Sequence, residues 1–134
     1  MLVLLASYGV QSFGADDPRQ HVQIPEPMER HMLSNMRDHL AAINEVLVNM
    51  ADGKLEEAAA IAEFRLGMSS LESHGASHLA GFMPEEMRQM GTAMHRAASR
   101  FALRAQEGEP LPAYRALGDI TSACVACHSN FRTR

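Results

Sequence analysis

Apolar residues between Pro25 and Gly53 recur at steps of three and four, and this spacing predicts one long helix with a single apolar face. Glu26 and Glu29 lie in its first turn, where acidic side chains favour the positive end of the helix dipole. Gly53 provides a helix stop. The apolar face consists of Met28, Met32, Met36, Leu40, Ile43, Leu47 and Met50.

Three further stretches have helical periodicity. The second helix is expected to start near Leu55 and to carry its stripe to Ser69, before a connection rich in Gly and Ser over 67–83. The third opens at Pro84 and breaks at 107–112, and the fourth runs from about residue 112 to the end of the chain. No useful length alternates with period two. The sequence therefore predicts an all-α fold, most economically an antiparallel four-helix bundle of helices of some 17 to 25 residues.

Composition and charge restrict the function classes. The chain has 134 residues, enough for one domain, and its formal net charge of −4 comes from interspersed acidic and basic residues. The absence of a basic block gives no indication of nucleic-acid binding. No Ser-His-Asp triad and no pair of catalytic carboxylates stands out, so we do not expect an enzyme.

The first residues have the character of a targeting segment. An apolar run over 2–6 is followed by small and polar residues, which predicts a signal peptide over 1–14, although no Lys or Arg precedes the run. The alternative is a disordered tail. The run is too short to span a membrane. We expect export to the periplasm and one domain over 25–134.

The chemistry is concentrated in the last helix. Cys124 and Cys127 are the only cysteines, and His128 follows at once. On a helix these three positions share a face, and that face is the apolar stripe, so all three are expected to point into the bundle.

Three chemistries use a Cys-x-x-Cys pair. A structural zinc site needs four ligands, and this pair has no second pair to complete it. A thioredoxin-like redox pair stands at the start of a helix after a strand, and no strand is predicted here. Covalent attachment of one c-type haem, with the adjacent His as an iron ligand, fits Cys-x-x-Cys-His best.

A chain of four helices with this motif close to its C-terminus resembles the class II c-type cytochromes, cytochrome c′ and its low-spin relatives. The ending "CVACHSNFR", with the pair Phe131-Arg132, is similar to that family's attachment helix, and 52–62 is similar to its turn into the second helix. The resemblance covers roughly 25–134, but 67–83 matches no pattern of the family.

The resemblance implies roles for further residues. The residue facing the iron opposite His128 comes from the first helix, at or near Met36, with Met32 as the alternative and His39 also within reach. Core packing is the other interpretation of both methionines. Arg132 is implied near the haem edge, where it pairs with a propionate, or else it is a solvated residue at the helix end.

Two functions remain open on this resemblance. A His/Met-ligated haem makes an electron carrier that works with redox partner proteins, whereas an open sixth site binds nitric oxide or carbon monoxide. A homodimer through the first two helices is a further possibility. His74 and His78 have the spacing of a copper or zinc pair, with His95 as a third ligand, but we expect these histidines to be scattered over the surface and helix caps.

Overall fold

The computed structural model describes residues 16–134, and within this range the chain is mainly helical, as predicted. The predicted signal peptide over 1–14 lies outside the described residues. None of the helices in 16–134 combines the length and the apolar character needed to cross a membrane. The elements are β1 (Gln20–His21), α1 (Glu26–Ala51), α2 (Leu55–Arg65), the 3-10 turn η1 (Met68–Ser70), α3 (Ala76–Ala80), α4 (Glu85–Gln106), α5 (Pro110–Asn130) and β2 (Phe131–Arg132).

The four predicted helices are present, and three of them have nearly the predicted bounds. The long apolar stripes and the prolines at the helix starts account for this agreement. Gly53, directly after α1, adopts the left-handed backbone that favours glycine, with φ +73°. The second helix is shorter than predicted, since α2 ends at Arg65 after 11 residues, whereas α4 has 22.

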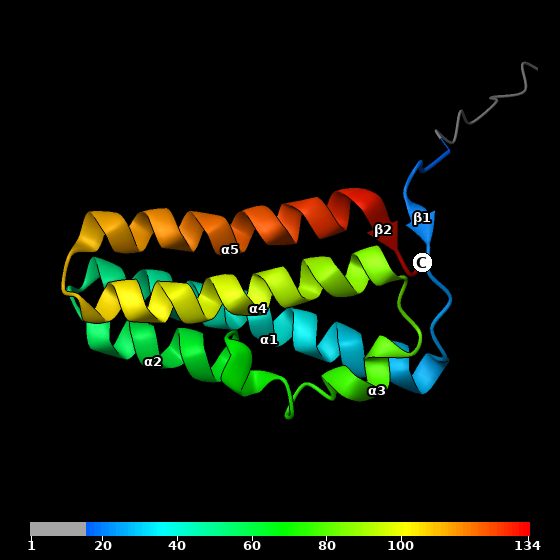
Figure 1. Cartoon of the computed structure of the whole chain (residues 1–134), viewed down its shortest axis with the longest axis horizontal. Coiled ribbons are helices and arrows are strands. Elements are labelled where there is room, and N and C mark those ends of the chain that lie inside the picture. The colour runs from blue at the N-terminus through cyan, green and yellow to red at the C-terminus, as the bar shows by residue number, and fades with distance from the viewer. Residues whose placement is uncertain (1–15) are drawn as a thin grey trace, which may run out of the picture.

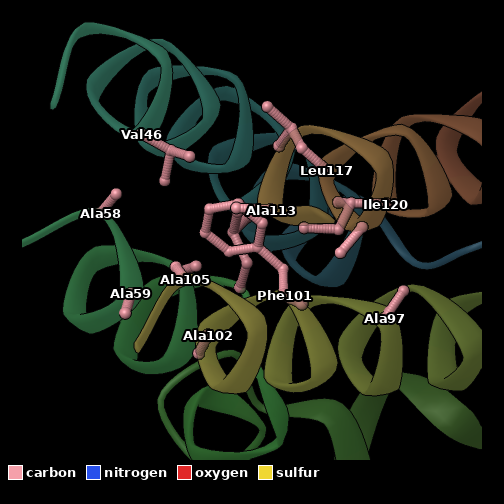
Figure 2. Packing of buried hydrophobic residues seen from close by; sticks show 14 of the residues in the cluster. Val46, Ala58, Ala59, Ala97, Phe101, Ala102, Ala105, Ala113, Leu117 and Ile120 are labelled. Carbon is pink, nitrogen blue, oxygen red and sulfur yellow. The ribbon is translucent and has the colours of Figure 1, made fainter. Parts of the chain in front are cut away.

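A hydrophobic core fills the end of the molecule where α2 lies. It is built from the C-terminal half of α1, all of α2, the second half of α4 and the first half of α5. Figure 2 shows the fully buried Phe101 of α4 at its centre, between Val46 of α1 and Ile120 of α5. Alanines at the contact of α2 with α4 let these two helices approach closely.

The other end of the molecule has a different construction because α2 is too short to reach it. At 1.5 Å per residue, α2 extends only about 17 Å, roughly half the length of α4. Residues 67–84, which we call the strap, run along this end in place of a long helix (Figure 1). The strap contains η1 and α3, and Leu79 is the buried residue of α3.

A two-residue parallel ladder joins the beginning and the end of the described chain. Gln20 pairs with Phe131 and His21 with Arg132, and Figure 1 shows this ladder at the end opposite the α4–α5 connection. The helix α5 therefore ends at Asn130, and our expectation that the fourth helix runs to the end of the chain is wrong. The backbone at Phe131 is extended, with φ −128° and ψ 148°, because it pairs with β1.

Candidate functional site

A groove of about 330 Å³ opens beside the Cys-x-x-Cys-His motif. Its wall includes Cys127 and His128 at the end of α5, Met32 and Met36 from α1, and Arg132 from β2. Residues separated by almost a hundred positions in the sequence thus surround one space. Five of the six predicted site residues lie in its wall.

Cys124, the sixth predicted residue, lies one turn before Cys127 on α5. Its side chain is half-buried and packs against the hydrophobic core rather than contributing to the wall of the groove. His128 is exposed to solvent, so the prediction that all three motif residues point inward is wrong for the imidazole. The reason is that α1 and α5 do not close over the motif at this end.

The two cysteines are free thiols. Burial raises the pKa of both side chains, and the neighbouring thiolate charge of Cys124 raises that of Cys127 further. A redox-active Cys pair has the opposite property, because the attacking cysteine needs a lowered pKa. The pair therefore lacks the lowered pKa that is typical of thiol–disulfide exchange.

Arg132 brings an unsatisfied polar atom to the groove. Its Nε is buried and has no hydrogen-bond partner among residues 16–134, and an oxygen of Asp17 is 3.8 Å away. Arg19 also lines the groove, is paired with Asp17 at 2.7 Å, and donates from Nη1 to the carbonyl oxygen of His128 at 3.3 Å. Buried polar atoms in proteins nearly always have partners, so the free Nε of Arg132 indicates a missing acceptor.

Sequence reasoning missed Arg19, because it lies outside the predicted helices, in the segment that β1 brings back to the motif. A basic residue a few positions before the first helix carries no signal of this placement. The pairing depends on two residues in each strand, which is too short for any periodicity to appear.

Methionines form much of the remaining wall. Met83 of the strap and Met87 of α4 face the same groove as Met32 and Met36 of α1. Met32 is buried, whereas Met36 is 37% exposed. Thioether side chains pack well against flat aromatic surfaces and are also soft metal ligands. His39, which we considered as a further iron ligand, is not part of this wall.

Gly91 brings the backbone of α4 into the wall of the groove. It is the seventh residue of a 22-residue helix, and glycine in a helix interior costs about 1 kcal/mol relative to alanine. A Cβ added to it would meet no atom within 4 Å, so the space in front of it is open. Gly91 belongs to the wall of the groove and also to that of a neighbouring cavity of about 160 Å³.

These observations test whether the residues present suit a haem. The groove offers a thiol, an imidazole, thioethers, open space before Gly91 and an unpartnered guanidinium nitrogen. This set has the chemistry that a plate with an iron centre and two carboxylates requires. The buried alanines of α2 and α4 do not line this groove. The alanines concerned are packed in the core at the other end: Ala58, Ala59, Ala62, Ala97 and Ala98.

The structure also corrects our interpretation of two histidines. His74 of the strap and His95 of α4 are buried, together with His39 of α1. Their rings form a cluster with centroids 4.8 to 5.8 Å apart. His78 is exposed, so it does not pair with His74 as a metal-binding couple. Across residues 16–134, no group of three or more His, Cys, Asp or Glu side chains has the arrangement of a metal site.

The histidine cluster was not recognisable from the sequence. His39, His74 and His95 come from three different elements, and only tertiary packing brings them together.

Comparisons with models of protein families, with curated proteins and with solved structures find no match to this chain.

Proposed function

We propose that this chain is a c-type cytochrome of four-helix-bundle architecture that carries electrons through one covalently bound haem. The observation that supports this most directly is the convergence of Cys127, His128 and Arg132 with two methionines of α1 around one groove. The motif itself accounts for the covalent link, and the fold accounts for the space beside it.

Each of the six predicted site residues has a role in this proposal. Cys124 and Cys127 would hold the prosthetic group through thioether bonds, and His128 would supply an imidazole ligand. Met36, or alternatively Met32, would supply a sulfur ligand. Arg132, whose Nε has no partner in the described chain, offers a hydrogen bond to a carboxylate. When bound, the haem supplies one-electron exchange between ferrous and ferric iron.

Binding of a small gas is the second candidate. The cavity of about 160 Å³ next to the groove is lined largely by apolar side chains and shares Met32, Met36 and Gly91 with the groove. Such a space suits a small uncharged molecule. In this second function neither methionine binds the iron, and the sixth site stays open.

The first experiment tests covalent attachment. We expect the protein, expressed with a cytochrome c maturation system, to keep its colour through acid-acetone extraction and to gain the mass of one haem. The matched control is the Cys124→Ala, Cys127→Ala double variant, which should lose all haem on extraction. Extraction of the haem from the wild type, or no haem at all, would refute the proposal.

Optical spectra then distinguish the two functions. Low-spin bands in both redox states favour the electron carrier, whereas high-spin bands favour gas binding.

The same proposal includes location and assembly. We propose a periplasmic protein that meets redox partner proteins and forms a homodimer through α1 and α2. Leu40 on α1 and Phe64 on α2 support the dimer, because each is 70% exposed. Replacing both by Gln should shift the mass measured by light scattering from dimer to monomer, and a monomeric wild type would exclude this part.

A further inference from the structure

His74 is the main attachment point of the strap to α1. Its backbone carbonyl oxygen accepts hydrogen bonds from His31 Nε2 and Asn35 Nδ2, both at 2.9 Å. Its ring nitrogen Nδ1 lies 3.4 Å from His39 Nε2 and 3.3 Å from the hydroxyl of Ser70. A single residue therefore joins the strap to three positions of α1.

Few apolar contacts hold the strap in addition. Leu79 is the buried residue of α3, and Ser70 is that of η1. Two further hydrogen bonds reach α4, from Met68 N to Ser99 Oγ at 2.9 Å and from Arg88 Nη1 to the carbonyl oxygen of Ala80 at 3.4 Å. A segment with so little buried apolar area opens at a lower free energy than the helices it covers.

The arrangement of the cluster requires neutral rings. The 3.4 Å contact between His39 Nε2 and His74 Nδ1 accommodates one proton between two nitrogens. If both rings are protonated, two N–H donors face each other with no acceptor between them. His95 stands beside both rings, and its Nδ1 donates to the carbonyl oxygen of Leu66 at 2.7 Å.

The surroundings provide little compensation for a positive charge. Burial lowers the pKa of all three rings, most strongly that of His39, and the neighbouring imidazoles lower that of His39 and His74 further. Asp38 of α1 acts in the opposite direction, but its carboxylate is already paired with Arg65 of α2. The other charged or titratable groups near the strap are His31 of α1, Glu63 of α2, which hydrogen-bonds to Ser69, and Arg88 of α4.

We propose that the strap is a proton-controlled cover, which leaves α1 when His74 and its two neighbours take up protons and so widens the half-open cavity of about 160 Å³ that it helps to line. The cavity is lined on one side by strap residues, among them Leu71, Leu79 and Met83. Its other wall includes Met32 and Met36, which also line the groove at the Cys-x-x-Cys-His motif. Acid thus widens a second route to that groove. The proposal does not depend on which group the groove holds.

Hydrogen exchange of the full-length protein as purified tests this cover. The reporter amides are Leu79 and Phe82, which are hydrogen-bonded within the strap, and amides of α4 near Phe101 serve as the internal reference. Rates are corrected for the intrinsic effect of pH. Suppose that opening requires the protonation of one histidine, whose pKa in the open state is the ordinary value of about 6.5. The equilibrium constant for opening then rises about tenfold for each pH unit below 6.5. We expect strap protection to fall about 30-fold or more between pH 7.5 and pH 5.0, with a much smaller change at the reference amides.

Variants identify the groups responsible. His74→Gln and His39→Gln each keep a hydrogen-bonding side chain that does not titrate, so each variant should show a smaller fall in strap protection than the wild type. His78→Gln is the matched control, because His78 is exposed on the same strap, and it should behave as the wild type. If the variants fold poorly, the ring signals of His39, His74 and His95 in the wild-type NMR spectrum should titrate together with the strap amides.

Each of three pH-dependent results would overturn the proposal. The strap amides could be equally protected at pH 7.5 and pH 5.0, or the fall in their protection could be as large in His74→Gln and His39→Gln as in the wild type. The third is that the histidine ring signals titrate at a different pH from the strap amides. Loss of strap protection at pH 7.5 on addition of EDTA would also overturn it, because it would assign the cluster to a bound metal instead.

Discussion

Replacing His39 by Gln should remove a large part of the pH dependence of folding. Burial, aided by the charges of His74 and His95, lowers the pKa of His39 from 6.5 to about 4. The unfolded chain therefore binds this proton first as the pH falls, and stability decreases between about pH 6.5 and pH 4. The difference of about 2.5 pKa units corresponds to about 3.4 kcal/mol in total, of which about 2.5 kcal/mol is lost by pH 4.5.

Urea unfolding of the wild type and of His39→Gln at pH 7.5, 5.5 and 4.5 measures this contribution. Carboxylates with lowered pKa values, such as those of Asp38 and Glu63, also reduce stability in acid, but they are present in both proteins. The relevant quantity is thus the difference between the two pH profiles, which should approach about 2 to 3 kcal/mol at pH 4.5. His78→Gln should follow the wild type. Parallel profiles for wild type and His39→Gln would show that the ring is not buried in its neutral form.

Two further predictions concern the groove. Met36→Leu should convert a low-spin haem to a high-spin haem that binds carbon monoxide. Met32→Leu should leave the optical spectrum nearly unchanged. If both variants remain low-spin, neither sulfur is a ligand of the iron. Leucine replaces methionine at a packing cost below about 1.5 kcal/mol, so unfolding would not explain a spectral change. The Cys124→Ala, Cys127→Ala double variant, which cannot retain haem, should melt well below the loaded wild type, because a ligand that binds only the native state stabilises it. Equal melting temperatures would argue against a pocket built around haem.

The sequence was sufficient to predict the helices with long apolar stripes. Met32 and Met50 are buried as their positions in the stripe of the first helix predict, whereas Leu40 and Leu47 of the same stripe are exposed. The length of α2 was not predictable, because Leu66 continues its stripe although the helix has already ended at Arg65. There the amide of Gly67 bonds back to the carbonyl oxygen of Ala62 at 2.8 Å, and the chain turns into the strap.

The candidate site was predictable only in part. Cys127 and His128 are marked by their motif, and Met32 and Met36 by the resemblance together with the stripe of the first helix. Met83 and the remaining contacts depend on how the strap and the β1–β2 ladder close the open end. Such contacts are made by single residues at large sequence separation, and local patterns carry no information about them. Gly91 is a signal that helical periodicity does not capture, since a glycine inside a helix calls for a reason in packing or function.

Gly91 therefore offers a test of the groove that does not touch any proposed ligand. Gly91→Leu places a side chain in the open space where the haem plate would lie. Gly118→Leu on α5 is the matched control, because a Cβ there also meets nothing within 4 Å, yet Gly118 is not part of the groove wall. Both substitutions should stabilise their helices by about 0.5–1 kcal/mol, since glycine is unfavourable in a helix interior.

The two variants should differ only in haem content. Gly91→Leu should fold as well as the wild type but carry several-fold less covalent haem per chain, measured by the pyridine haemochrome absorbance against protein mass. Gly118→Leu should keep the full complement. Circular dichroism of both proteins separates a blocked groove from a misfolded chain. A Gly91→Leu protein with normal helicity and a full complement of haem would mean that the plate lies elsewhere, and the argument from the open space before Gly91 would fail.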